Sequence, residues 1–320
     1  MKKITVIGAG MMASALCVPM RDNGCEVKLI GTPLDDAIID GLKADGRHIT
    51  LDRRLPDGID FYRFSELDDG FFDCDIVVSG VSSFGVEWFA EAIIPYLKPG
   101  IPVLGVTKGL YETGRGLISF PEYYETKRSD VPFCAVGGPC TSYELADRAN
   151  SSVAFCGRDK AVLDLCASAL ETPYYHVERS TDVRGIETAV ALKNCYALGV
   201  TLAVGEYEVK APGRMYYNPQ AAMFTESVRE MRRLVARIGG AAESLDFGIG
   251  DLYVTIYGGR TRKLGILLGS GKTFAEARAI LNGVTLESVE IARRIGAYVE
   301  ARGEIDDFPL LKRIYGMIKQ

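Results

Sequence analysis

The stretch KITVIGAGMMASAL, residues 3–16, determines how the amino-terminal half of this chain folds. A run of β-branched residues leads into a helical pattern, and Gly8, Gly10 and Ala13 have the spacing GxGxxA. In that spacing the first glycine permits a tight turn, the second lets the backbone approach a pyrophosphate, and the small third residue lets helix and strand pack closely. The amino end of the helix offers N–H groups and a positive dipole to phosphates. The stretch therefore predicts a dinucleotide-binding βαβ unit.

Short β-rich runs alternate with helical patterns through the first half, which indicates parallel βαβ units. We expect strands at residues 3–8, 26–31, 75–81, 101–106 and 132–138, a sixth at 150–157 and a further one at 172–178. A helical pattern at 88–100 ends in a proline and a glycine. Pro19 is expected to end or kink the helix after the glycine-rich turn, because it cannot donate to the hydrogen-bond ladder.

The second half has helical periodicity and no convincing strand. We expect helices at residues 184–204, 219–239, 273–282, 285–302 and 308–318, with a capping box at 273–276 and one long polar interruption at 207–218. A chain of 320 residues also exceeds the usual size of a single core. The predicted fold is an α/β Rossmann-type doubly wound parallel sheet, residues 1–180, followed by an all-α domain, residues 181–320.

The composition narrows the function classes. With 48% hydrophobic residues, 25% charged residues, a net charge of −5 and no long basic run, the chain is typical of a globular protein that does not bind nucleic acid. The first residues resemble a secretory signal, but glycines interrupt the apolar stretch and a second strand follows; we expect no membrane insertion. The 8 cysteines have no CxxC spacing and the 2 histidines, His48 and His176, lack neighbouring ligands. We therefore expect a reducing, cytoplasmic setting, no metal site, and packing or surface roles for the histidines.

Lys193 is an unusual residue in its place. Apart from Glu187 it is the only charge in the apolar helical stretch at 187–203. An unpaired buried charge is strongly disfavoured, and lysines normally lie near helix ends. Desolvation can tune a lysine to donate and accept protons near neutral pH, so Lys193 is a candidate for proton transfer.

Other polar residues are placed where a ligand of this fold would lie. Lys108 follows one expected strand and Gly138 ends the next, at the carboxyl edge of the sheet. Lys108 and Lys193 could converge on one ligand. The stretch GIGDLYVTIYGGRTRKLG, residues 248–265, has an acid, Asp251, and arginines suited to a phosphate or carboxylate; read alone, it is typical of a solvated turn. No carboxylate ends the second strand, where Thr32 lies, so either NAD or NADP fits.

Taken together, the motifs GAGMMASAL, VTKGL, GGPCTSYEL, ETAVALKN and GIGDLYVT followed by GGRTRKLG resemble the NAD(P)-dependent glycerol-3-phosphate dehydrogenase family over nearly the whole chain. The resemblance implies interconversion of dihydroxyacetone phosphate and sn-glycerol 3-phosphate, a step of glycerophospholipid metabolism. We expect a homodimer because two-fold dimers are the commonest oligomers. The resemblance implies that Lys193 transfers the proton, with Lys108, Asp251 and Thr255 as further catalytic residues. It also implies two binding sets. Substrate contacts are Lys108, Gly138, Asn194, Arg260 and Thr261; cofactor contacts are Gly8, Gly10, Met11, Met12, Ala13, Thr32, Ser82, Lys108, Arg260 and Glu287.

The chain departs from the family pattern at several positions. Thr261 stands where the family usually has asparagine, Thr141 and Ser142 replace an apolar residue and alanine, and residues 225–227 read Thr-Glu-Ser instead of Thr-Arg-Gly. These changes concern the substrate more than the reaction type. Two alternatives stay open: a dehydrogenase of another phosphorylated ketose or of a ketopantoate-like 2-keto acid, and a regulatory protein that binds NAD(P) without turnover. The presence of both lysines disfavours the second.

Overall fold

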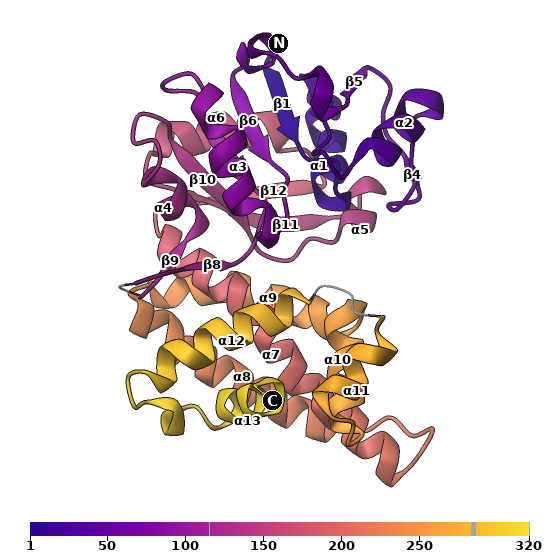
Figure 1. The fold of residues 1–320 in the computed structure, drawn as a ribbon, viewed down its shortest axis with the longest axis vertical. Helices are drawn as coiled ribbons and strands as arrows, with labels where there is room; N and C mark the ends of the chain where they lie inside the picture. The colour runs from indigo at the N-terminus through magenta and orange to yellow at the C-terminus, as the bar shows by residue number, and fades with distance from the viewer. Residues whose placement is uncertain (115, 283–285, 320) are drawn as a thin grey trace. The chain divides into compact units, whose positions relative to one another are not determined.

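A computed structural model describes residues 1–114, 116–282 and 286–319 of the chain (Figure 1). The chain divides into two compact units, Met1–Lys108 with Ser119–Val183, and Gly109–Ile118 with Arg184–Gln320. Each unit is described by itself.

The first unit is built on an eight-stranded sheet in the order β12-β11-β10-β7-β6-β1-β2-β5. Its strands are β1 (Lys3–Ile7), β2 (Glu26–Ile30), β5 (Ile59–Tyr62), β6 (Ile76–Ser79), β7 (Val103–Gly105), β10 (Phe133–Gly137), β11 (Ser151–Gly157) and β12 (Tyr175–Ser180). In this sheet the neighbouring strands β10, β7, β6, β1, β2 and β5 are parallel to one another. β11 is antiparallel to β10, and β12 is parallel to β11. The Rossmann-type sheet is confirmed. β5 was not expected, because its four residues lie in a polar stretch with little β pattern.

Helices cover both faces of this sheet. They are α1 (Met11–Asp22), α2 (Asp36–Asp45), α3 (Val86–Ala92), α4 (Phe120–Glu125), α5 (Ser142–Ala146) and α6 (Lys160–Leu170). α1 packs against α5 and α6, while α3 and α4 meet through Phe89 and Tyr124, whose ring centroids are 5.4 Å apart. In β1 the alternation follows these layers: Ile4 and Val6 join the core cluster that includes α1, while Thr5 donates to a carbonyl oxygen with its hydroxyl. Successive side chains of a strand point to opposite faces of the sheet, which explains why Thr5 differs from Ile4 and Val6.

Of the two outcomes expected at Pro19, an end of the helix is wrong, and a kink stays a prediction. α1 does not end at Pro19 but runs on to Asp22, and the next ladder bond, from the N–H of Asn23 to the carbonyl of Pro19, is intact at 3.0 Å. Proline removes one donor, and burial of the helix around it outweighs that single loss. The expected helix at 88–100 is α3 followed by a short 3-10 helix at Ile94–Tyr96.

The second unit is helical. Its helices are α7 (Val183–Lys210), α8 (Tyr217–Ile238), α9 (Leu245–Ile256), α10 (Gly259–Gly269), α11 (Phe274–Ile280), α12 (Glu287–Glu300) and α13 (Pro309–Ile318). By length and composition α7 could cross a membrane, but 83% of its apolar window is buried inside the protein. It is the core helix of this unit, around which the others pack (Figure 1).

Most of the features predicted for this unit are confirmed. The capping box at Thr273 and Glu276 is confirmed, with the hydroxyl of Thr273 accepting from the Glu276 N–H at 3.2 Å. The interruption expected at 207–218 is shorter, since α7 continues to Lys210 and α8 begins at Tyr217. The expected helix 285–302 corresponds to α12, and Thr285 lies outside the described residues. The stretch 248–265, expected as a turn when read alone, is mostly helix in α9 and α10.

A hairpin of β8 (Leu110–Thr113) and β9 (Gly116–Ser119) was not predicted, and residues 109–118 belong to the second unit although the expected first domain was 1–180. The guanidinium of Arg294 on α12 donates to the carbonyl of Leu110 at 2.5 Å and ties the hairpin to the helices. Among the strands described, these are the ones that join the helical unit.

Candidate functional site

At one position of the glycine-rich turn, Gly8, both the backbone conformation and the surroundings require glycine. Gly8 has φ +103°, and a Cβ there would lie 2.9 Å from the carbonyl oxygen of Gly80 at the end of β6. A Cβ on Gly80 would overlap Ala13, so the small residue at the third motif position lets α1 approach the sheet. This close approach of loop, helix and strand is what the motif predicted.

A cavity of about 500 Å³ opens at this turn in the first unit. The predicted cofactor contacts Gly8, Gly10, Thr32 and Ser82 all line it, together with Asp35 and Trp88. Of the other predicted contacts on α1, Met11 is exposed, Met12 is half-buried and Ala13 is buried against Gly80. The cavity therefore has the glycine cradle and the size that a nucleotide portion of NAD or NADP requires.

Asp35 gives this cavity a carboxylate that sequence reasoning did not place. Its Oδ2 accepts from the N–H and the hydroxyl of Thr32, both at 2.8 Å, and from the N–H of Ala9 at 3.1 Å. The acid comes five residues after β2 ends, too late for the usual position of a ribose-binding carboxylate. Its contact with the glycine-rich turn depends on the loop after β2, which the motif spacing does not reveal.

Lys108 and Gly138 are in contact in the first unit, at the sheet edge where the sequence analysis placed both residues. The ammonium of Lys108, just beyond β7, donates to the carbonyl oxygen of Gly138, just beyond β10, at 2.7 Å. Lys108 is half-buried, and Gly138 has φ +105°. β7 and β10 are parallel neighbours, so residues that follow them lie at one sheet edge.

Lys193 has a buried acidic partner in the second unit. Its Nζ lies 2.5 Å from Oδ1 of Asp251 on α9, and the two side chains are 13% and 3% exposed. A buried ion pair of this geometry explains how the apolar helix accommodates a lysine. Thr255, one turn further along α9, donates its hydroxyl to the backbone carbonyl of Asp251 at 2.7 Å. The predicted trio is thus linked through Asp251.

α9 packs on α7 beside this pair because of a glycine. A Cβ on Gly248 would lie 2.8 Å from the carbonyl oxygen of Ala189. Gly248 is one turn before Asp251, and Ala189 is one turn before Lys193, so the close helix contact sets the separation on which the ion pair depends. α10 approaches α7 in the same way, with Gly265 against Thr201 and Gly269 against Leu202.

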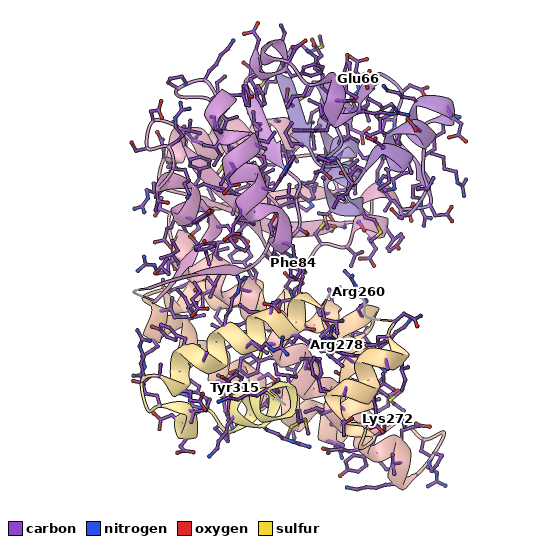
Figure 2. The ribbon with its side chains drawn as sticks, in the orientation of Figure 1. Glu66, Phe84, Arg260, Lys272, Arg278 and Tyr315 are labelled. Atoms are coloured by element: carbon purple, nitrogen blue, oxygen red, sulfur yellow. The ribbon has the colours of Figure 1, made fainter. Side chains whose placement is uncertain are left out.

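The predicted phosphate contacts lie on helices of the second unit. Arg260 and Thr261 are in the first turn of α10, where Arg260 is exposed (Figure 2), and Asn194 is half-buried next to Lys193. Arg262 donates to the carbonyl of Ile256 at 2.7 Å and so caps the end of α9. The predicted cofactor contact Glu287 is the first residue of α12. At the start of α10, the amino end of the helix together with Arg260 suits an anion such as phosphate.

Sequence reasoning missed the role of His48, for which it expected packing or surface exposure. The ring is fully buried, and Nε2 lies 2.8 Å from the carbonyl oxygen of Ala9 in the glycine-rich turn. No local sequence signal marks this contact, since His48 is 39 residues from Ala9.

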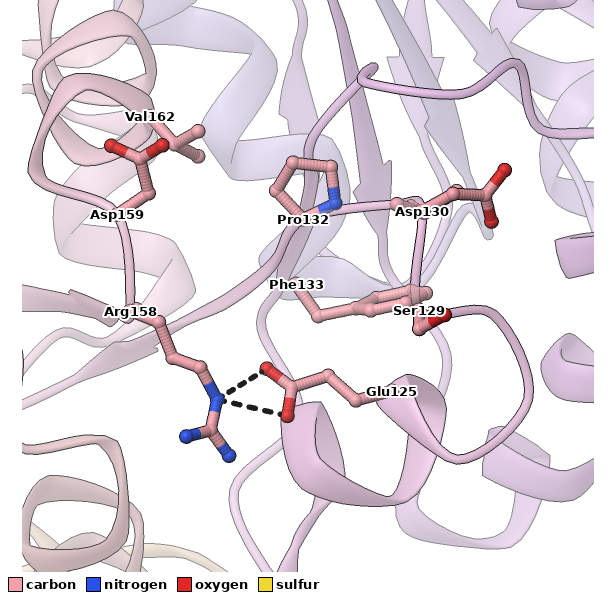
Figure 3. Close-up of a pocket in the computed structure, with 10 residues that line it drawn as sticks. Glu125, Ser129, Asp130, Pro132, Phe133, Arg158, Asp159 and Val162 are labelled. Carbon is pink, nitrogen blue, oxygen red and sulfur yellow. Dashed lines mark hydrogen bonds and ion pairs between the residues drawn. The ribbon is translucent and has the colours of Figure 1, made fainter.

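Other features of the described residues do not add to the site. No group of three His, Cys, Asp or Glu side chains that could hold a metal ion occurs among residues 1–114, 116–282 and 286–319. A second cavity of about 340 Å³ lies beside the paired side chains of Glu125 and Arg158 and contains none of the predicted site residues (Figure 3).

Comparison with known proteins places this geometry in a family. Residues 3–162 match the amino-terminal domain model and residues 182–320 the carboxy-terminal domain model of NAD-dependent glycerol-3-phosphate dehydrogenase. The chain is 32% identical to the NADP(+)-dependent glycerol-3-phosphate dehydrogenase of Archaeoglobus fulgidus, over 98% of this chain and 94% of that protein. It is 29% identical to the glycerol-3-phosphate dehydrogenase [NAD(P)+] of Agathobacter rectalis, over 87% and 80% of the two chains.

Solved structures share the fold. The crystal structure of glycerol-3-phosphate dehydrogenase from Coxiella burnetii matches with a TM-score of 0.84 at 22% identity, covering 99% of this chain and 94% of that one. A ketopantoate reductase from Ralstonia eutropha matches with a TM-score of 0.60 at 17% identity, covering 99% and 97%. Both domain models and the full-length relative agree: the chain belongs to the NAD-dependent glycerol-3-phosphate dehydrogenase family.

Proposed function

We propose that this chain interconverts dihydroxyacetone phosphate and sn-glycerol 3-phosphate with NAD(H) or NADP(H), and that Lys193 is its proton-transfer residue. The observation that carries the proposal is the buried pair of Lys193 and Asp251 at 2.5 Å in a chain of this family. A dehydrogenase of another phosphorylated ketose or of a ketopantoate-like acid is less favoured, since the family match covers both domains.

The first unit fits the cofactor. Gly8 and Gly10 would let the backbone approach the pyrophosphate, and Thr32 and Ser82 would contact the nucleotide from the same cavity. Met11, Met12, Ala13, Lys108, Arg260 and Glu287 remain proposed cofactor contacts. When bound, the nicotinamide supplies or takes up the hydride.

Lys193 would hold the proton that the reaction needs. Asp251 stabilises the charged ammonium and fixes where its N–H bonds point. In reduction the ammonium donates a proton to the oxygen of the substrate carbonyl as negative charge develops there, and in oxidation the neutral amine takes it back. Thr255 contributes through its hydroxyl, which donates to the backbone carbonyl of Asp251 and so helps to fix the position of that residue.

The remaining residues would bind and orient the substrate. Lys108 adds positive charge near the same oxygen, where it stabilises the transition state more than the ground state. Arg260, with Asn194 and Thr261, would hold the phosphate and supply binding energy away from the reacting carbon. We propose that Gly138 shapes the substrate site through the carbonyl that accepts from Lys108.

We also propose a cytoplasmic homodimer that takes a small phosphorylated substrate. Two-fold dimers are the commonest assemblies of soluble proteins, and cysteines that stay as thiols, most of them buried, suit a reducing compartment. In such a setting the reaction would supply the glycerol phosphate of glycerophospholipid metabolism.

A substrate panel tests the proposed function. Purified protein is mixed with NADH or NADPH and, in separate reactions, with dihydroxyacetone phosphate, ketopantoate or a four-carbon ketose phosphate, and loss of the reduced-nicotinamide absorbance is followed. We expect dihydroxyacetone phosphate to be reduced far faster than the others. Faster reduction of another substrate would contradict the named substrate, and cofactor binding without any turnover would contradict the enzymatic assignment.

A further inference from the structure

His48 is a buried titratable side chain that the proposed reaction does not use. It ends β3 (Arg47–His48), which forms a small antiparallel hairpin with β4 (Arg53–Arg54). The hairpin is mostly on the surface, with Ile49 55% exposed, yet the His48 ring is 0% exposed. A polar ring buried from an exposed hairpin needs hydrogen-bond partners.

The hydrogen bonds determine which ring nitrogen holds the proton. The backbone N–H of Leu51 donates to Nδ1 at 3.1 Å, so Nδ1 is an acceptor. Nε2, 2.8 Å from the carbonyl oxygen of Ala9, must therefore hold the proton and donate it to that carbonyl. Burial lowers the pKa of His48, which favours this neutral form.

Both polar backbone groups of Ala9 form hydrogen bonds with side chains. Its carbonyl accepts from His48, and its N–H donates to Oδ2 of Asp35 at 3.1 Å. The N–H of Gly8 donates to the carbonyl of Ile30 at 2.7 Å. Two side chains from outside the motif thus fix the middle residue of the glycine-rich turn, at the wall of the cavity lined by Gly8 and Gly10.

We propose that His48 is a positioning residue that holds the glycine-rich turn in the shape that binds the cofactor pyrophosphate. This rests on the proposed function, in which that turn binds NAD(H) or NADP(H). A turn already in its bound shape loses less freedom on binding, so His48 strengthens cofactor affinity. The pyrophosphate is bound equally in ground and transition states, so His48 acts on Kd and KM rather than on kcat.

Two matched substitutions separate this role from support of the hairpin. His48→Gln places an amide nitrogen near the position of Nε2, so it keeps a donor for Ala9 but loses the acceptor for Leu51. His48→Asn places an oxygen near the position of Nδ1, so it keeps the acceptor for Leu51 but loses the donor for Ala9. Neither introduces a charge. His48→Asn removes the hydrogen bond to Ala9, and His48→Gln removes the contacts that Leu51 and Thr50 make with Nδ1.

Calorimetric titration of each variant with NADH and with NADPH gives the direct readout. Loss of one pre-organising hydrogen bond should weaken binding of whichever cofactor the wild type binds about tenfold in His48→Asn. His48→Gln should stay within about threefold of wild type, and kcat should change little in either variant. Unchanged Kd in His48→Asn, or a larger loss in His48→Gln than in His48→Asn, would overturn the proposal.

Hydrogen exchange of the cofactor-free wild type tests one requirement of the proposal, a turn that is fixed before cofactor binds, even if His48→Asn fails to fold. The amide of Ala9 should exchange slowly, because the turn is fixed before cofactor binds. Rapid exchange there would overturn the proposal. A wild-type protein that binds neither NADH nor NADPH would instead refute the proposed function, so the two failures are distinguishable.

Discussion

Replacing Gly248 by alanine tests the helix contact that supports the Lys193–Asp251 pair. The added Cβ would lie 2.8 Å from the carbonyl oxygen of Ala189, so α9 must move away from α7 by roughly half an ångström to reach an ordinary contact. Forced overpacking costs about 1–3 kcal/mol, whereas alanine gains about 0.5–1 kcal/mol over glycine inside a helix. The net expectation is a loss of about 1–2 kcal/mol in the free energy of unfolding.

The matched control is Gly316→Ala. Gly316 lies in α13, and a Cβ added there would meet no heavy atom within 4 Å beyond its own stretch of helix, so the substitution should stabilise the chain by about 0.5–1 kcal/mol. Urea unfolding followed by circular dichroism gives both values. Turnover should fall about tenfold in Gly248→Ala only, because it displaces the 2.5 Å contact between Lys193 and Asp251. If Gly248→Ala matched Gly316→Ala in stability and turnover, the role of this helix contact would be refuted.

Three further results are expected. Glu230→Ala should lower the free energy of unfolding by about 3–5 kcal/mol in urea titrations, because the buried carboxylate accepts from the N–H groups of Leu310 and Leu311 at 2.7 and 2.9 Å; an unchanged midpoint would contradict this. Burial lowers the pKa of His48 despite nearby Asp35, so wild-type stability should fall as pH decreases below about 6.5. His48→Gln should lose that part of the pH dependence of stability. If stability depended on pH in the same way in wild type and His48→Gln, His48 would be excluded as its source. Arg260→Ala should raise KM for dihydroxyacetone phosphate at least about tenfold, with a smaller change in kcat, in steady-state assays; an unchanged KM would remove Arg260 from the phosphate site.

Much of the fold was predictable because its signals are local. The glycine spacing after β1 and the β-rich runs that became β6, β7 and β10 each follow from neighbouring residues. β5 was missed because it is short and pairs with β2, a strand far back along the chain. The β8–β9 hairpin was missed because each of its strands has only 4 residues. α9 and α10 were difficult for a different reason: the glycines that suggest a turn serve instead as contact points on α7.

The candidate site likewise contains residues that local sequence signals predict and residues that they do not. Lys193 was found because a charge in an apolar helix breaks a local pattern. The motif resemblance named Asp251 as a further catalytic residue, and the structure shows that the two side chains pair. The contacts of Asp35 and His48 with Ala9 join residues 26 and 39 positions apart through side-chain geometry. No periodicity or spacing in the sequence indicates such contacts.

The assignment of proton transfer to Lys193 is tested most directly by the turnover of Lys193→Ala with dihydroxyacetone phosphate and the preferred cofactor. General acid catalysis contributes about 10²–10⁴-fold, so kcat should fall by that factor, while calorimetric binding of the cofactor stays close to wild type. Circular dichroism must show a folded variant, because Asp251 loses its partner in a buried place. A folded Lys193→Ala protein with wild-type turnover would contradict the assignment.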